Sequence, residues 1–577
     1  MITAGLKLTQ SGGVALLNGD KLEFNVEMQK LDNGRRYSNV DELDDITKIL
    51  ARYGYAVGDV GQWVIDGWDG AVNGHVSTLS GGVPLDLMVA PYHETGKVPD
   101  PAMPGYSGKI VIAGESKEYQ SYVHVASHLA AAYCTSPFAR RGEPSMVMVW
   151  DGGCFPRLYC VDADGRIEPG GEVFPLIGHT YSMASQHWGP YARKNKSTNV
   201  DDLSVAGKMM AYIALGTPRA EIKAVFKELF HEHFEADTPR VREYREKIIG
   251  CGSTGEPSHG YVHAFLTEVA GRTEQMGVSD EDVLASVHTF IEELLLERVA
   301  AKIRAWKGGE AWNLCFAGGC ALNIKWNSAL RAHPIIKAMW VPPFPDDSGS
   351  SIGTACLRAA DGKGLRPLEW GTRQGPELVR TPHVPQGWTV SPCRPEELAR
   401  LIHHTGEPVV LLNGPAELGP RALGARSIIA PAVDPQMKVR LNDAKKREHF
   451  RPVAPLCLVE HAPTIFDPGT PDPHMLFEHR VRPEWVDKVP AIMHLDGTAR
   501  LQTVSVEDDP TLAAILREYQ KWSGIPVLCN TSANYNGRSF FPDVASAIEW
   551  GQVDMVWSEG VLYRRSVGHD GRLGNEK

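Results

Sequence analysis

The sequence predicts an α/β protein with two units, the first of them internally duplicated. Two stretches, VALLNGDKLEFNVEM and MVMVWDGGCFPRLYCVDADG, alternate short apolar runs with Gly and Asp, as β-meanders do, and helical stretches follow them. Between residues 361 and 393 the periodicity fails and Pro and Gly accumulate, which is typical of a domain boundary. We therefore expect a first unit over residues 1–365, a linker over 366–392 and a second unit over 393–577.

The composition is that of a soluble globular protein, with 43% hydrophobic and 22% charged residues in 577. Lys and Arg number 59 against 70 Asp and Glu, so the net charge of -11 disfavours a nucleic-acid partner. The ten cysteines form no Cys-x-x-Cys pair, which indicates a reducing compartment. Since neither an export signal nor an apolar run of about 18 residues stands out, we expect a cytoplasmic protein without a membrane partner.

Local patterns predict the main elements of both units. Ser279 and Asp282 form a helix start, and an apolar face continues to the stop at Gly308-Gly309. The segment WNLCFAGGCALNIKWNSAL (312–330) reads as a strand, a Gly-Gly turn and a helix, an arrangement that aims helix N–H groups at a ligand, commonly a phosphate. In the second unit EPVVLLNG, PVAPLCLV and GIPVLCN read as strands.

A histidine pair in YVHVASHLAAAY (122–133) suggests a metal site. His124 and His128 stand one turn apart on an Ala-rich helix, so both imidazoles can bind one ion. The zinc-protease motif needs Glu directly after the first His, and Val125 there disfavours peptidase chemistry. Two ordinary histidines on a half-buried helix remain the alternative.

Two aspartates could complete this site. Asp151 ends a strand before Gly-Gly, and Asp347 lies in the small-residue turn PPFPDDSGSSIGTA. Together with the histidines they could form an octahedral site with open positions for a nucleotide phosphate. Each Asp alone could equally be a turn residue that caps its own backbone.

The second unit carries clustered cations and a polar loop. The loop NTSAN follows a strand and can exchange several hydrogen bonds with a small polar ligand. Several charge-assisted hydrogen bonds, each worth about 1.5–3 kcal/mol, would hold a phosphorylated ligand, although any single cation could be a solvated surface charge. The candidate cations are Arg421, Arg426, Lys445, Lys446, Arg447, Arg451 and Arg500.

These pieces together resemble the antibiotic and nodulation-factor O-carbamoyltransferases. The motifs that carry the resemblance, in the same order, are LCFAGGCALNIKWNSAL, PDDSGSSIGTA, ELGPRALGARSI, KKREHFRPVAP, HLDGTARLQTV and PVLCNTSANYNG. VHVASHLAAAYCTSPF and VMVWDGG resemble the branch with the cephem and macrolide enzymes. The match runs from about residue 120 to about residue 555.

The resemblance implies a fold and an activity. The first unit would be an actin-like ATPase (ASKHA) domain, similar to the universal tRNA threonylcarbamoyl transferase, and the second a YrdC/Sua-like domain. Members use ATP, with Mg²⁺, and carbamoyl phosphate to make carbamoyl adenylate, and then carbamoylate a hydroxyl of a macrolide, sugar or cephem. The resemblance also implies a divalent metal, with iron expected.

The resemblance further implies roles for individual residues. It makes His124, His128, Asp151 and Asp347 the metal ligands, with catalytic roles for His124, His128, Arg451 and Arg500. It places the nucleotide at Gly318, Gly319, Asn323, Ser350, Lys445, Arg447 and Ser532. It places carbamoyl phosphate at Arg421, Arg426, Arg451, Arg500 and Asn530.

One departure from the family pattern concerns the general base. Relatives usually carry a His-Asp pair in the first hairpin, where this chain has Gln10 and Ser11. No general base is therefore assigned. Two alternatives to the O-carbamoyltransferase stay open: a tRNA threonylcarbamoyl-type modification enzyme, which the acidic balance disfavours, and a non-catalytic nucleotide- or metal-binding protein.

Overall fold

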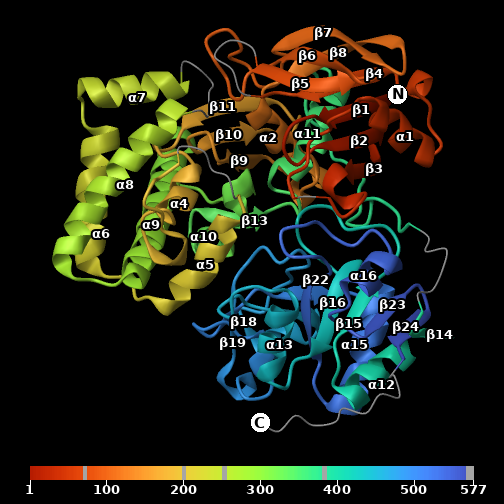
Figure 1. The fold of residues 1–577 in the computed structure, drawn as a ribbon. Coiled ribbons are helices and arrows are strands. Elements are labelled where there is room, and N and C mark those ends of the chain that lie inside the picture. Colours follow the sequence, from red (N-terminus) through yellow and green to blue (C-terminus); the bar gives the residue numbers. More distant parts are fainter. Residues whose placement is uncertain (35, 69–73, 198–202, 250–255, 380–385, 567–577) are drawn as a thin grey trace.

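The computed structural model describes residues 1–34, 36–68, 74–197, 203–249, 256–379 and 386–566. Figure 1 shows the first unit, coloured red to green, above the second unit, coloured cyan to blue, with a group of helices at the left of the first unit. The architecture is α/β, as the sequence predicts. The last part of the predicted second unit, 567–577, lies outside the described residues.

The first sheet runs in the order β3-β2-β1-β4-β8-β7. The hairpin predicted from VALLNGDKLEFNVEM is confirmed as β2 and β3. A separate hairpin, β5-β6, and the helix α1 accompany this sheet. The bounds are β1 Ile2–Lys7, β2 Gly13–Asn18, β3 Lys21–Glu27, α1 Asp44–Arg52, β4 Gln62–Asp66, β5 Gly74–Ser80, β6 Val83–Val89, β7 Tyr106–Ile112 and β8 Glu115–Tyr122.

The second sheet repeats the topology of the first. Its order is β11-β10-β9-β12-β13. In each sheet three antiparallel strands, β3-β2-β1 or β11-β10-β9, are followed by two strands parallel to the last of them, β4 and β8 or β12 and β13. The first sheet has one further strand, β7, antiparallel to β8. The duplication predicted from the two β-meanders is therefore visible as one strand arrangement used twice. The bounds are β9 Ser145–Val149, β10 Arg157–Val161, β11 Ile167–Glu172, β12 Trp312–Ala317 and β13 Ile336–Trp340.

Two helices, α2 (His124–Cys134) and α11 (Ser350–Ala360), lie between these sheets and pack against each other. Helix α11 also contacts β1, β2 and β4, and α2 also contacts β9 and β12. The two helices approach closely because Gly353 has no side chain: a Cβ there would lie 1.8 Å from the Ser127 carbonyl oxygen. This crossing fixes the start of α2 relative to the start of α11.

We expect Gly353→Ala to destabilise the first unit by about 1–3 kcal/mol, because the methyl group must push α2 and α11 apart. Denaturant unfolding measures the change. Gly271→Ala is the matched control, since Gly271 is also helical and a Cβ there meets nothing within 4 Å. If Gly353→Ala and Gly271→Ala had the same free energy of unfolding, the close packing of α2 against α11 at Gly353 would be contradicted.

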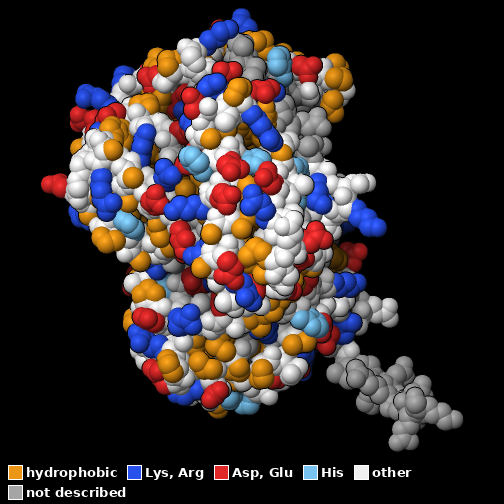
Figure 2. All heavy atoms as spheres, turned by 90° about the vertical axis from the view of Figure 1, so that its left-hand side faces the viewer, with side chains coloured by type: hydrophobic (Ala, Val, Ile, Leu, Met, Phe, Trp, Pro, Cys, Tyr) orange, Lys and Arg blue, Asp and Glu red, His pale blue; other side chains and the backbone are white. Residues whose placement is uncertain are grey.

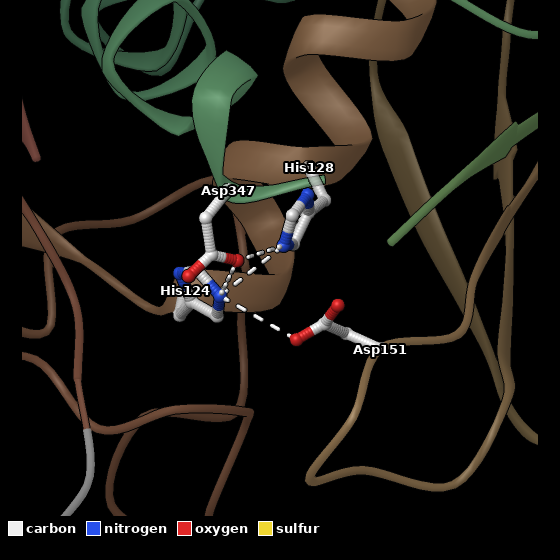
Figure 3. Close-up of side chains that lie close together, drawn as sticks. All are labelled: His124, His128, Asp151 and Asp347. Carbon is white, nitrogen blue, oxygen red and sulfur yellow. Dashed lines mark hydrogen bonds and ion pairs between the residues drawn. The ribbon is translucent and has the colours of Figure 1, made fainter. Parts of the chain in front are cut away.

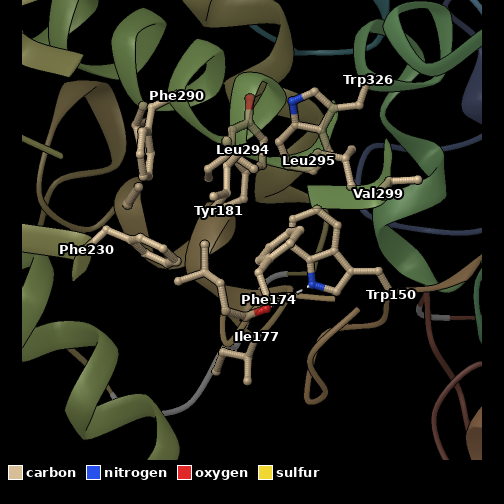
Figure 4. Close-up of a cluster of buried hydrophobic side chains, with 14 of the residues drawn as sticks. Trp150, Phe174, Ile177, Tyr181, Phe230, Phe290, Leu294, Leu295, Val299 and Trp326 are labelled. Carbon is tan, nitrogen blue, oxygen red and sulfur yellow. Dashed lines mark hydrogen bonds between the residues drawn. The ribbon is translucent and has the colours of Figure 1, made fainter. Parts of the chain in front are cut away.

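A group of helices is inserted between β11 and β12 and covers one end of the second sheet (Figure 1). The predicted helix over 279–309 is confirmed as α9, where Ser279 Oγ accepts a hydrogen bond from Asp282 N at 3.2 Å. Trp150, after β9, stacks on Trp326 with ring centroids 5.3 Å apart, and Figure 4 shows this pair among side chains of the inserted helices. The bounds of the inserted helices are α4 His179–Ala184, α5 Val205–Tyr212, α6 Ala220–Phe230, α7 Pro239–Ile249, α8 Glu256–Met276 and α9 Asp280–Lys307. Outside the insertion, α3 Pro137–Arg140 precedes β9 and α10 Ile324–Ala332 follows β12.

The second unit is built on a sheet in the order β14-β24-β23-β15-β16-β22-β17-β21. The three strands predicted here are confirmed as β15, β17 and β22. Strand β14 falls inside the expected linker, yet it pairs with β24. The strand bounds are β14 Trp388–Pro392, β15 Val409–Leu412, β16 Arg426–Pro431, β17 Ala454–Leu458, β18 Phe466–Asp467, β19 His479–Val481, β20 Thr498–Ala499, β21 Gln502–Val504, β22 Val527–Ser532, β23 Met555–Ser558 and β24 Val561–Arg565. The helix bounds are α12 Pro395–Thr405, α13 Gln436–Ala444, α14 Ala462–Ile465, α15 Pro510–Ser523 and α16 Val544–Trp550.

The surface carries both signs of charge. On the face in Figure 2, acidic and basic side chains lie interspersed over the inserted helices.

Within the part of the chain that the structure describes, no helix combines the length and apolarity needed to cross a bilayer.

Candidate active site

The four residues predicted as metal ligands come together in the first unit. His124 Nε2 lies 3.1 Å from His128 Nε2 and 3.3 Å from Asp347 Oδ1, and Asp347 Oδ1 lies 3.4 Å from His128 Nε2. Asp151 Oδ2 is 3.9 Å from His124 Nε2. Figure 3 shows both imidazoles and both carboxylates turned toward one point, with one possible ligand atom of each within 4.8 Å of the others.

The fold explains this convergence. His124 opens α2 directly after β8, and the helical repeat places His128 on the same face. Asp151 follows β9, and Asp347 begins the short turn before α11. Because α2 and α11 cross between the sheets, residues separated by more than 200 positions meet at their starts.

The donor set fits a divalent ion. Bonds of about 2.0–2.2 Å from a metal to N and O ligands put neighbouring ligand atoms roughly 3 Å apart and opposite ones about 4 Å apart. The separations among His124, His128 and Asp347 and from His124 to Asp151 are 3.1–3.9 Å and fall in this range, and all four ligand atoms lie within 4.8 Å of one another. Two imidazoles and two carboxylates are a mixed set suited to first-row transition metals.

The electrostatics of the cluster also favour a cation. Burial disfavours the imidazolium of His124, but the carboxylates of Asp66 and Asp347 outweigh burial and raise the pKa of His124 to about 9. Burial would raise the pKa of Asp347, yet Lys7 and His124 hold it well below its usual value. Without a metal the cluster therefore retains a proton, which an ion would displace.

A cavity of about 290 Å³ connects this cluster with the second unit. Asp151, Asp347 and Gln10 line its first-unit side, and Asn530 and Ser532 line its second-unit side. Of the other predicted site residues, the cavity is lined by Gly319, Asn323, Arg421, Arg447, Arg451 and Arg500.

The arginines of the cavity carry positive charge that the described residues leave poorly compensated. Burial, with Arg451 next, lowers the pKa of Arg447 to about 9, and burial, with Arg36 next, lowers that of Arg421 to about 10. The pKa of Arg500 is held well below its usual value by burial and by Arg421. The Nε atoms of Arg421 and Arg500 are buried without a hydrogen-bond partner among the described residues. Such a cluster is suited to an anionic ligand.

Three of the candidate cations, Arg426, Lys445 and Lys446, do not line the cavity. Arg426 is 2% exposed and donates to the carbonyl oxygens of Gly414 at 2.8 Å and Ala425 at 2.9 Å. These contacts hold the backbone, and the predicted contact of Arg426 with carbamoyl phosphate stays a prediction. Lys445 Nζ donates to Ser532 Oγ at 2.9 Å and also to Asn534 Oδ1, so it holds the NTSAN loop in place.

Three predicted nucleotide residues serve local structure. Gly318 has φ +90°, and a Cβ there would lie 2.4 Å from the Trp150 carbonyl oxygen. Asn323 caps α10 by accepting from Lys325 N at 3.2 Å, while its Nδ2 has no partner among the described residues. Ser350 is fully buried at the start of α11, and its Oγ is unpartnered within the same described set.

Several residues at the site had no predicted role from the sequence. Lys7 Nζ lies 3.4 Å from Asp347 Oδ2, and Tyr92 donates its hydroxyl to Asp151. Arg36 lines the cavity from the first unit. Gln10 Nε2 donates to Asp347 Oδ2 at 3.3 Å, so this departure from the family pattern lies beside the cluster. Lys7 stands at the end of an apolar strand, and that position is the signal that could have found it.

Comparison with known proteins identifies the family. Residues 3–98 and 105–356 match the family described as Carbamoyltransferase N-terminus, and residues 399–565 match Carbamoyltransferase C-terminus. The chain is 49% identical to nodulation protein U of Rhizobium tropici over 568 residues, which cover 98% of this chain and 96% of the relative. It is 30% identical to the 3'-hydroxymethylcephem-O-carbamoyltransferase of Streptomyces clavuligerus over 581 residues, 98% of this chain and 100% of the relative. The sequence identity of this chain to the nodulation protein is thus higher than its identity to the cephem enzyme, although two N-terminal motifs resemble the branch with the cephem and macrolide enzymes. The chain belongs to the carbamoyltransferase family.

Proposed function

We propose that this protein is an ATP-dependent O-carbamoyltransferase that uses carbamoyl phosphate and passes through carbamoyl adenylate. The observation that carries the proposal is the cavity that joins an under-compensated arginine cluster to a His-Asp cluster. Carbamoyl transfer is the reaction of the family to which the chain belongs. The two ends of the cavity suggest which step of that reaction takes place at each end.

The arginine end would form the adenylate. Carbamate, released with phosphate when carbamoyl phosphate reacts with water, attacks the α-phosphorus of ATP, and pyrophosphate leaves. Arg421, Arg447, Arg451 and Arg500 would hold the phosphate oxygens, which explains why so many cations are buried together. Mg²⁺ would accompany ATP.

The His-Asp end would carry the transfer. His124, His128, Asp151 and Asp347 would hold a divalent ion, Fe²⁺ by family resemblance, and when bound it would supply Lewis-acid polarisation. The acceptor oxygen attacks the carbamoyl carbon, and AMP leaves. Because both steps share one cavity, the adenylate would be shielded from water.

We also propose that the first unit is an actin-like ATPase (ASKHA) domain and the second a YrdC-like domain. The repeated arrangement of the two N-terminal sheets supports the first assignment. The NTSAN loop at the end of β22, with Ser532 at the cavity, supports the second. A cytoplasmic location is supported by the described cysteines, which are free of disulfides.

The acceptor is proposed to be a hydroxyl of a small-molecule natural product of macrolide, sugar or cephem type. The Streptomyces clavuligerus relative is named for a hydroxymethyl acceptor. The cavity lining includes apolar residues such as Met210 and Leu322 and polar ones such as Ser182, which suits a partly apolar alcohol.

The proposal is tested by mixing the protein with ATP and carbamoyl phosphate and measuring pyrophosphate. We expect release that requires both substrates. An acceptor panel analysed by mass spectrometry should then show a carbamoyl increment on a hydroxyl compound. Failure to release pyrophosphate, with or without acceptors, would instead favour a non-catalytic nucleotide- or metal-binding protein.

A further inference from the structure

Two buried charged residues lie next to the His-Asp cluster without belonging to it. Asp66 ends β4 and Lys7 ends β1, and these side chains are 1% exposed. The strands are parallel neighbours with Leu6 opposite Ile65, so their next residues, Lys7 and Asp66, reach the same edge of the sheet. That edge faces the start of α2, where His124 lies.

Asp66 contacts the ring nitrogen of His124 that points away from the cluster. Asp66 Oδ2 lies 2.6 Å from His124 Nδ1, whereas His124 Nε2 lies 3.1 Å from His128 Nε2. A neutral imidazole carries one N–H, and a carboxylate accepts it. With the proton on Nδ1, the lone pair of Nε2 is directed at the cluster.

Other contacts hold Asp66 and the ring in place. Lys7 Nζ lies 3.1 Å from Asp66 Oδ2 and 3.8 Å from the centroid of the Trp68 ring. Tyr92 and Trp68 pack on His124 with ring centroids 4.6 and 5.4 Å away. These aromatic contacts restrict the ring plane, but neither decides which nitrogen is protonated; Asp66 does.

We propose that Asp66 is a positioning residue for a divalent metal ion, which fixes the tautomer and orientation of His124 so that Nε2 is a ligand. The inference rests on the metal site of the proposed function. Charge supports it: Asp66, Asp151 and Asp347 with Lys7 leave two negative charges, which a divalent ion neutralises. The competing explanation is an ion-pair network that only stabilises the fold.

The test measures metal affinity rather than turnover. Full-length protein is titrated with Mn²⁺ alone, and free Mn²⁺ is followed by electron paramagnetic resonance. We expect Asp66→Ala to raise the Kd roughly 10–100-fold, as loss of an outer-shell partner does. Asp66→Asn should raise it less, because the amide oxygen still accepts from Nδ1, and its matching shape guards against misfolding.

Glu27→Gln is the matched control. Glu27 is also 1% exposed, stands on β3 of the same sheet and pairs with Lys30 Nζ at 2.6 Å, but it contacts none of the four ligands. Its Kd for Mn²⁺ should equal that of the wild type.

Each outcome decides the inference. A folded Asp66→Ala protein with wild-type Mn²⁺ affinity and a lower melting temperature would show a purely structural role and overturn it. A wild-type chain that binds no Mn²⁺ would overturn the metal site and this inference together. Pyrophosphate release from ATP and carbamoyl phosphate is scored separately, so failure of the adenylate step stays distinguishable.

Discussion

Arg500→Met is expected to lower pyrophosphate release by on the order of 10²–10³-fold, the cost of removing one preorganised charge-stabilising group. The side chain lines the cavity, and its Nε lacks a partner among the described residues, so its donors are available to a phosphate. Burial and Arg421 make its charge unfavourable without a ligand. The variant should therefore melt no lower than the wild type, because Met keeps much of the volume and removes the repulsion.

Coupled pyrophosphate detection and thermal unfolding measure the two effects. Arg440→Met is the matched control: Arg440 is exposed on α13 and pairs with Glu407, so activity should be unchanged. An Arg500→Met protein that melts well below the wild type would show that the arginine supports the fold rather than a ligand.

His128→Ala is expected to abolish carbamoyl transfer while leaving pyrophosphate release intact. The substitution removes one of four ligand atoms, so metal affinity should fall by more than the roughly 10–100-fold that an outer-shell partner is worth. The arginine end lies in the other unit and keeps its geometry. Released pyrophosphate without carbamoylated product is therefore the expected signature.

Metal content by elemental analysis and product by mass spectrometry test this division. His288→Ala is the control for loss of a buried imidazole, since His288 is 4% exposed and lies 3.1 Å from the Tyr181 hydroxyl, outside the ligand set. It should retain metal. Loss of both half-reactions in a folded His128→Ala protein would refute the assignment of two steps to two ends of the cavity.

Local elements were predictable because their causes are local. Ser279 predicted the start of α9, and Gly308, with φ +87°, follows its last residue. The Ala-rich context of His124 and His128 predicted α2, and the helical repeat placed both imidazoles on one face. Each of these signals lies within a few residues of the structure that it specifies.

The different roles of Arg421 and Arg426 could not be predicted from the local sequence. Arg421 and Arg426 stand in one Gly- and Pro-rich segment, and nothing in their neighbourhood separates them. In the structure Arg421 lines the cavity, while Arg426 begins β16 and donates to the carbonyl oxygen of Gly414. The direction of each side chain depends on how β15, β16 and the preceding loop pack.

The sequence alone determined the α/β class, the main strands and helices, the family resemblance and the candidate ligands His124, His128, Asp151 and Asp347. Only the tertiary structure decided that these four side chains converge and that Asp66 and Lys7 support them. It also decided that one cavity reaches from them to Arg500. The physical reason is that periodicity and caps act over a few residues, whereas the site forms where two helices cross between two sheets, bringing together residues far apart in the chain.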